Sequence, residues 1–261
     1  MLTFTAGAAT DTGRVRSQNE DSLLTAEHFV AVADGMGGHA AGDVASRLAV
    51  QRLAELDRQP APRPTDVLAA IAAMNAEILR SAADNSARAG MGTTLAGVGV
   101  VRVGGSEHWI VFNVGDSRVY RYFDGALSQV TVDHSEVEEL RAAGRLTAAE
   151  ARDYARRNIV TRSLGSDPAP EPDMWVFPPT SAERFVVCSD GLTLELEEAE
   201  IVKVLREQPD AQAAADTLVA HALAAGGRDN VTAIVVNLDI VASRSGVDAD
   251  TAPRIRDAEG R

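Results

Sequence analysis

A predicted hairpin, YRYFDGALSQV at residues 120–130, narrows the range of folds open to this chain. Asp124 and Gly125 form the residue pair typical of a two-residue type I′ turn, and strand-like runs flank them on both sides. Because a hairpin joins its two strands antiparallel, this stretch disfavours a doubly wound parallel sheet. The chain is therefore expected to belong to the α+β class, with mainly antiparallel sheets.

Short runs rich in β-branched and aromatic residues, bounded by Gly, Asp or Asn, predict the strands. They are expected at residues 2–8, 23–25, 29–33, 95–103, 109–114, 118–123, 184–189 and 231–238. Helices are expected at residues 42–56, 65–83, 135–143, 197–207 and 210–225, where Ser, Thr and acidic residues gather at the starts. Two antiparallel sheets flanked by helices fit this order best.

Composition and patterning predict one folded domain over residues 1–240. Of the 261 residues, 45% are hydrophobic, which is enough to bury a substantial core. Residues 241–261 are polar, rich in small residues and without period, so we expect a disordered tail there.

We see neither a signal peptide nor an apolar run long enough to span a membrane. The single cysteine, Cys188, lies in an apolar run and suits a reducing compartment, so a cytoplasmic location is expected.

The charge of the chain limits its partners. The formal net charge is −13 and the pI about 4.8, so the average surface repels nucleic acid and anionic membranes. A phosphorylated substrate would need a local positive centre, which a bound metal ion could supply.

Carboxylates recur at the ends of predicted strands. Asp34 in AVADGMGG and Asp190 in VVCSDGL each follow a buried strand, Asp229 in GGRDNVT precedes one, and Asp116 in NVGDSR lies between two. Any one Asp-Gly pair alone is more often a turn. Four carboxylates crowded at strand ends repel one another unless they hold a cation, and oxygen ligands select Mg²⁺ or Mn²⁺ over zinc. Together they predict a metal centre.

Two further residues fit such a centre. Gly35 would let a backbone carbonyl approach the cation, because a side chain there would block it. No Lys-Ser/Thr pair follows this glycine-rich segment, which excludes a P-loop. Arg16, in TGRVRSQNED, could hold two phosphate oxygens at once, although the segment taken alone also fits a solvated turn.

A series of motifs resembles the PPM, or protein phosphatase 2C, family of metal-dependent serine/threonine phosphatases, in its bacterial form. The motifs are GRVRSQNED, ADGMGGHAAGD, MGTTL, NVGDSRVY, VVCSDGL and GGRDNVTAIVV, in the family's order, over residues from about 5 to 238. The resemblance implies an α-β-β-α sandwich with a two-metal centre at one end of the paired sheets. It also implies hydrolysis of phosphoserine and phosphothreonine by direct attack of a metal-bridging water, with no covalent phosphoenzyme.

The resemblance assigns a role to each matching residue and implies two or three Mn²⁺ or Mg²⁺ ions. Asp34 is similar to the carboxylate that bridges both metals, Gly35 to the carbonyl ligand, Asp190 and Asp229 to ligands of one metal, and Arg16 to the phosphate-holding arginine. Glu20 and Asp21 match residues that act on the second metal largely through water, and Asp116 matches a ligand of a third metal.

The group that protonates the leaving oxygen stays open. Met36 stands where many eukaryotic relatives carry a histidine; His39 is a candidate general acid, but it equally fits a structural or capping role, and His134 is a weaker candidate. Cys188 lacks the arginine-rich loop of a cysteine phosphatase, which favours a core role for it.

Two segments depart from the pattern or vary within the family. After SDGL the chain continues TLELEEAEI, where relatives usually place a polar turn. Residues 133–172 correspond to the variable flap, and we expect that segment to gate access of substrate.

Phosphorylated proteins are the expected partners, including serine/threonine kinases or their substrates. The alternative function is a catalytically silent module of the same fold that binds phosphoproteins or regulatory partners. Loss of a metal carboxylate would have signalled that alternative, and none of the matching carboxylates is lost.

Overall fold

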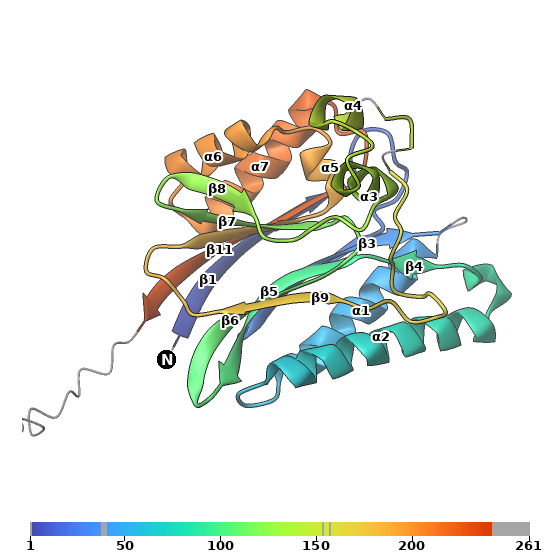
Figure 1. Ribbon diagram of the computed structural model, residues 1–261, viewed down its shortest axis with the longest axis horizontal. Coiled ribbons are helices and arrows are strands. Elements are labelled where there is room, and N and C mark those ends of the chain that lie inside the picture. The colour runs from blue at the N-terminus through green and yellow to red at the C-terminus, as the bar shows by residue number, and fades with distance from the viewer. Residues whose placement is uncertain (1, 38–40, 153, 157, 242–261) are drawn as a thin grey trace, which may run out of the picture.

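The computed structural model describes residues 2–37, 41–152, 154–156 and 158–241. Two antiparallel sheets pack face to face, and a layer of helices covers the outer face of each (Figure 1). The predicted α-β-β-α sandwich is therefore confirmed. The tail predicted over residues 241–261 lies almost wholly outside the described residues.

The first sheet contains both the first and the last described strands. Its order is β1, β11, β10, β7, β8, and its neighbours pair antiparallel. The strands are β1 (Leu2–Asp11), β7 (Arg118–Phe123), β8 (Ala126–Gln129), β10 (Arg184–Cys188) and β11 (Val231–Val241). Helices α6 (Glu198–Glu207) and α7 (Ala211–Ala225) cover its outer face (Figure 1).

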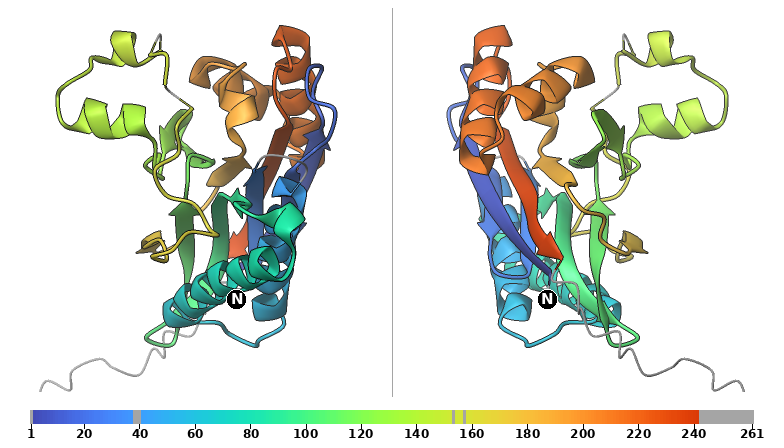
Figure 2. Two further views of the ribbon diagram at one scale, coloured as in Figure 1. Left: turned by 90° about the vertical axis from the view of Figure 1, so that its right-hand side faces the viewer. Right: turned by 90° about the vertical axis from the view of Figure 1, so that its left-hand side faces the viewer.

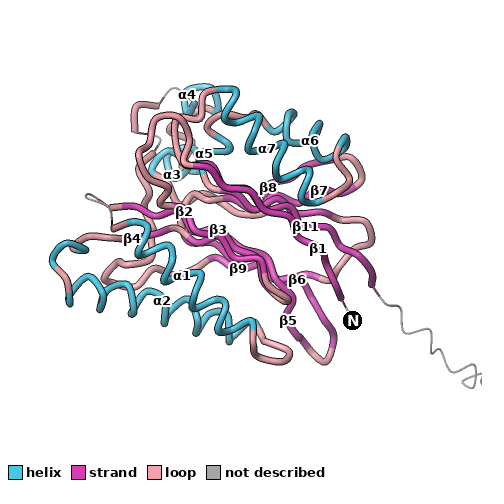
Figure 3. The backbone as a smooth tube through the Cα atoms, turned by 180° about the vertical axis from the view of Figure 1, so that it is seen from behind, coloured by secondary structure: helices cyan, strands magenta, loops and turns pink. Residues whose placement is uncertain are grey.

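The second sheet has the order β2, β3, β5, β6, β9, and a short β4 pairs with β3. Its strands are β2 (Asp21–Thr25), β3 (Phe29–Met36), β4 (Gly92–Thr93), β5 (Leu95–Val103), β6 (Ser106–Val114) and β9 (Asp173–Phe177). Helices α1 (Gly42–Asp57) and α2 (Pro64–Asp84) lie along its outer face, as the tube in Figure 3 shows from behind.

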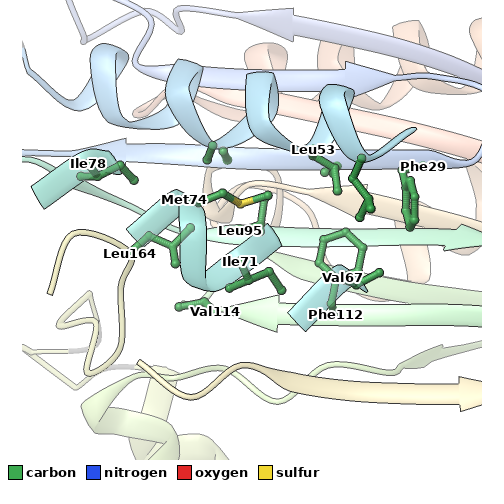
Figure 4. Packing of buried hydrophobic residues seen from close by; sticks show 14 of the residues in the cluster. Phe29, Leu53, Val67, Ile71, Met74, Ile78, Leu95, Phe112, Val114 and Leu164 are labelled. Carbon is green, nitrogen blue, oxygen red and sulfur yellow. The ribbon is translucent and has the colours of Figure 1, made fainter. Parts of the chain in front are cut away.

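Apolar side chains fill the spaces between these layers. Under the second sheet, Leu53 of α1 and Met74 of α2 pack with Leu95 of β5 (Figure 4). Between the two sheets, the Trp109 and Phe185 rings meet edge to face with their centroids 5.1 Å apart. This buried middle layer fixes how the ends of the two sheets face each other.

A helical insertion lies at one end of the sandwich. Between β8 and β9 the chain forms α3 (Glu136–Ala142), α4 (Ala148–Arg152) and connecting loops, which we call the flap. Figure 2 shows the flap standing apart from α6 and α7. Among the described residues, we find no helix with the length and apolar character needed to cross a membrane.

Most predicted elements are confirmed, with corrections at the short ones. Asp124 and Gly125 both have positive φ, 50° and 76°, as a type I′ turn requires. Strand β3 continues through Asp34 and Gly35, because both pair with neighbouring strands, so these residues lie within the strand rather than after it. Sequence patterning missed β4, β9, α4 and the single turn α5 (Asp190–Thr193). Of these, β4, α4 and α5 are too short to show a period, and β9 depends on its pairing with β6.

Candidate active site

Both sheets contribute carboxylates to one end of the sandwich. Asp34 lies in β3 and pairs with Asp21 of β2, while Asp116 lies between β6 and β7. From the other sheet, Asp190 lies two residues after β10 and Asp229 lies two residues before β11. The charges of these residues act on one another, so the structure brings the predicted strand-end carboxylates together.

Asp34 lies at the centre of this group. Withdrawal from water raises its pKa well above the ordinary value, and the charges of Asp21, Asp190, Asp116 and Asp229 raise it further. Its carboxyl hydrogen-bonds to Asp190, whose own pKa is raised by burial and by Asp229. Without a cation this cluster holds protons that isolated carboxyls would release near pH 4.

Asp21 is held by one oxygen and leaves the other without a protein partner. Its Oδ2 accepts hydrogen bonds from the hydroxyls of Ser189 at 2.8 Å and Thr232 at 2.6 Å. Its Oδ1 is buried and has no hydrogen-bond partner. Burial raises the pKa of Asp21 to about 6, although the two hydroxyls oppose that rise. A buried carboxylate oxygen without a donor suits a cation or its bound water.

Asp116 faces the flap side of the cluster. Burial raises its pKa to about 7, and the charges of Asp190 and Asp133 add to the rise. A groove of about 750 Å³ begins beside Asp116 and Asp190 and runs between the flap and the start of α6. The carboxylate cluster therefore opens onto this groove through Asp116 and Asp190.

Arg16 lies at the rim of the same cluster. Its Nη2 donates to Asp229 Oδ2 at 2.7 Å, and its side chain is 53% exposed. The hydrogen bond and the charge of Asp229 raise the pKa of Arg16. Asn230 fixes the loop that carries Arg16, since its Nδ2 donates to the carbonyls of Thr12 and Gln18.

Two glycines bring β3 and α1 into backbone contact at this end. A Cβ on Gly35 would lie 2.3 Å from the carbonyl oxygen of Gly42 and 2.6 Å from that of Glu20. No side chain fits at Gly35, because these backbone atoms occupy the space that a Cβ would need. The Glu20 carboxyl accepts a hydrogen bond from the Gly42 backbone, and partial burial raises its pKa.

The donor set fits hard divalent cations. The cluster offers carboxylate oxygens and the Gly35 backbone, with neither thiolate nor imidazole among its described members, and such oxygen donors suit Mg²⁺ and Mn²⁺. Within the described ranges, no three His, Cys, Asp or Glu side chains already converge on one point as a metal site.

Of the two histidines predicted as general-acid candidates, the structure describes His134 alone. His39 lies outside the described residues. His134 is buried; its Nδ1 accepts from the Gly115 backbone at 3.1 Å, and its Nε2 lies 3.1 Å from Asp173 Oδ2. These contacts tie the start of the flap to β9 and occupy both ring nitrogens.

Cys188 is buried in the core, where burial raises its pKa to about 12, so it is no nucleophile.

Sequence analysis missed the neutral residues that support the carboxylates. Ser189, Thr232 and Asn230 are three of these residues, and Thr94 is a fourth. The Thr94 hydroxyl accepts a hydrogen bond from the Asp34 backbone at 2.9 Å and bonds to the Ser117 hydroxyl at 2.7 Å. The signal available was adjacency, since Ser189 and Asn230 each stand next to a candidate ligand.

Comparison with known proteins identifies a family for this chain. The family model described as protein phosphatase 2C matches residues 14–225. The serine/threonine phosphatase stp of Listeria monocytogenes is 36% identical over 242 residues, which cover 88% of this chain and 94% of that protein. The serine/threonine protein phosphatase PstP of Mycobacterium tuberculosis is 36% identical over 241 residues, which cover 91% of this chain but 45% of that longer protein.

Solved structures agree with the sequence matches. The crystal structure of the M. tuberculosis phosphatase PstP/Ppp superposes with a TM-score of 0.84 and 36% identity, covering 92% of this chain and all of that one. The catalytic domain of PstP in complex with two manganese ions gives a TM-score of 0.83 at 34% identity, with the same coverage. The chain is therefore a member of the protein phosphatase 2C family of metal-dependent serine/threonine phosphatases.

Proposed function

We propose that this chain removes phosphate from phosphoserine and phosphothreonine in proteins, using Mn²⁺ or Mg²⁺ held by its carboxylate cluster. The observation that supports this most strongly is the set of mutually raised carboxyl pKa values at one end of the sandwich, beside an arginine. Such a cluster is unfavourable by itself and becomes favourable around cations.

The proposed metal-holding residues are Asp34, the Gly35 carbonyl, Asp190 and Asp229, with Asp116 available to a third ion. Glu20 and Asp21 would act on a second ion through water, which suits the unpartnered Oδ1 of Asp21. When bound, the ions supply a water that is ionised near neutral pH and neutralise charge on the phosphoryl oxygens.

Arg16 would bind the phosphoryl group. Its guanidinium is exposed at the rim of the cluster and can offer a planar pair of N–H donors to two phosphate oxygens. Because Asn230 anchors the loop on both sides of Arg16, the guanidinium is presented from a fixed backbone. The leaving serine or threonine oxygen needs a proton, and His39 remains the candidate general acid.

The flap would gate access of protein substrates. Its two ends meet, because Ser135 pairs with Val160 and the Glu136 backbone donates to the Ile159 carbonyl at 2.9 Å. Replacing residues 137–158 by a short Gly-Ser linker should therefore preserve the sandwich. We expect hydrolysis of p-nitrophenyl phosphate to stay within about threefold of wild type, whereas kcat/KM for a phosphothreonine peptide should change at least about tenfold. Unchanged kinetics on both substrates would argue against gating.

We place this activity in signal transduction in the cytoplasm, opposite serine/threonine kinases or acting on their substrates. Named phosphatases among the relatives support this setting, as does the single, buried cysteine.

The decisive test measures hydrolysis of a phosphothreonine peptide and of p-nitrophenyl phosphate with EDTA, Mg²⁺ or Mn²⁺. Wild type should turn over both substrates only with metal, and Asp190→Ala should abolish turnover. Glu77→Gln, on the helical layer away from the cluster, is the matched control and should keep wild-type rates. Metal binding without turnover by the wild-type protein would instead favour the silent binding module.

A further inference from the structure

An ion pair between a half-exposed arginine and a buried glutamate carboxylate lies next in sequence to the candidate metal ligands. Glu195 lies two residues after α5, and its side chain is only 2% exposed. Its partner Arg228 immediately precedes Asp229 and is 57% exposed. The pair therefore joins two chain segments that each carry a candidate ligand, Asp190 in one and Asp229 in the other.

The contact fixes main chain as well as side chain. Glu195 Oε1 accepts from the backbone N and the Nε of Arg228, both at 2.9 Å, and Oε2 accepts from Nη2 at 3.0 Å. Nη2 also donates to the Leu194 carbonyl at 3.2 Å. A two-pronged arginine–carboxylate contact sets distance and orientation together. Glu195 therefore holds the backbone one residue before Asp229.

The other end of the pair is fixed to Asp190. The Leu194 backbone donates to the Asp190 carbonyl at 2.8 Å, and the Glu195 backbone donates to the Leu192 carbonyl at 3.2 Å. The two segments also touch directly, because a Cβ on Gly191 would lie 2.0 Å from the Asn230 carbonyl oxygen. The Glu195–Arg228 pair therefore reinforces a contact that already brings the segments of Asp190 and Asp229 together.

The same loop supports the phosphate-binding arginine. The Arg14 backbone donates to the Gly227 carbonyl at 2.6 Å, and a Cβ on Gly13 would lie 2.1 Å from the Asp229 carbonyl oxygen. The segment that carries Arg16 thus rests on the segment that Glu195 holds.

We propose that Glu195 is a positioning residue that, through Arg228, sets the separation of Asp190 and Asp229 and so tunes the affinity for Mn²⁺. This inference rests on the proposed assignment of Asp190 and Asp229 as metal ligands. A glutamate this deeply buried is tolerated because its arginine partner satisfies both oxygens. Groups that orient metal ligands typically change metal affinity by about 10- to 100-fold when altered.

The test is calorimetric titration of Mn²⁺ into the metal-stripped full chain. Glu195→Gln should weaken Mn²⁺ binding about tenfold, and Arg228→Lys, which keeps the charge but loses the fork, should weaken it less. Asp229→Asn should bind far more weakly than either. Glu77→Gln removes a glutamate from an ion pair with Arg52 between α1 and α2, and it should bind Mn²⁺ as wild type does.

A second readout separates positioning from simple stabilisation. Hydrolysis of p-nitrophenyl phosphate by Glu195→Gln should return to within about threefold of wild type at saturating Mn²⁺, since the defect lies in metal affinity. If Glu195→Gln lowers the melting temperature of the metal-free protein but keeps wild-type Mn²⁺ affinity, the pair is purely structural and the proposal is overturned.

The remaining outcomes distinguish this inference from the proposed function. Wild-type Mn²⁺ binding by Asp229→Asn would overturn the ligand assignment and this inference with it. Loss of binding in Asp229→Asn alone, with Glu195→Gln and Arg228→Lys unchanged, would overturn only this inference. If Glu195→Gln does not fold, the Mn²⁺ affinity of Arg228→Lys decides instead, and a wild-type affinity in that variant overturns the proposal.

Discussion

A carboxyl group with a raised pKa destabilises the folded protein once it ionises. For Asp116, burial and the charges of Asp190 and Asp133 raise the pKa to about 7, whereas an unfolded aspartate titrates near 4. The folded state therefore binds more protons than the unfolded state between these values, and stability falls as pH rises through that window. Above pH 7 this one group would cost up to about 4 kcal/mol.

Asp116→Asn should remove that dependence. In EDTA, the melting temperature of the variant relative to wild type should rise as pH is raised from 4 to 7 and then level off. Thermal unfolding monitored by circular dichroism at each pH measures this difference. A difference that stays constant with pH would contradict the assigned pKa.

Arg16 should act through the geometry of its guanidinium more than through its charge. Arg16→Lys keeps the charge and loses the paired donors, so we expect KM for p-nitrophenyl phosphate, measured at saturating Mn²⁺, to rise about tenfold or more. Arg47→Lys is the control, because Arg47 is similarly exposed, at 51%, and also pairs with an aspartate. Equal effects of the two substitutions would show that Arg16 has no special role.

Among the elements, the crossing of β3 and α1 decides whether the cluster can form. A Cβ on Gly42 would lie 2.7 Å from the carbonyl carbon of Gly35 and 2.9 Å from the backbone N of Met36. These are backbone atoms and cannot move aside as a side chain could. Gly42→Ala should therefore lower the free energy of unfolding by about 1–3 kcal/mol and weaken Mn²⁺ binding.

Gly125→Ala is the matched control for this substitution. Gly125 lies in the hairpin turn with no atom within 4 Å of an added Cβ, although its φ of 76° disfavours alanine. It should lose roughly 1 kcal/mol of stability and keep wild-type Mn²⁺ affinity. Denaturant unfolding and calorimetry test both variants, and normal metal affinity in Gly42→Ala would refute the close-packing argument.

Elements long enough to show several turns or alternations of apolar residues were predictable from the sequence. Shorter elements depended on their tertiary partners. The predicted strands at residues 95–103 and 118–123 match β5 and β7 at both ends. In contrast, β9 has only five residues and exists by pairing with β6, a long-range contact that local patterning does not contain. The charged site residues were recognisable by type and motif, but Ser189 and Thr232 gain their importance only when folding brings both to Asp21.

At the scale of the whole molecule, net charge should govern which peptides arrive fastest. The chain carries a formal charge of −13, so peptides with basic flanks are attracted and those with acidic flanks repelled. Raising NaCl from 50 to 500 mM should lower kcat/KM for a phosphothreonine peptide with lysine flanks and raise it for one with glutamate flanks. A phosphothreonine peptide with alanine flanks serves as the reference. The same salt response for all three peptides would contradict long-range steering.

The place of β11 in its sheet has a consequence for synthesis on the ribosome. Although β11 is the last described strand along the chain, it lies between β1 and β10, and Asp229 stands two residues before it. Until β11 has left the ribosome, β1 lacks the strand to which it hydrogen-bonds in the sheet. Strand β1 can therefore join its sheet only after β11 has been made. Translation would therefore deliver the final sheet strand and the final candidate metal ligand together, and the chain should gain its fold and its capacity to bind metal at one late moment.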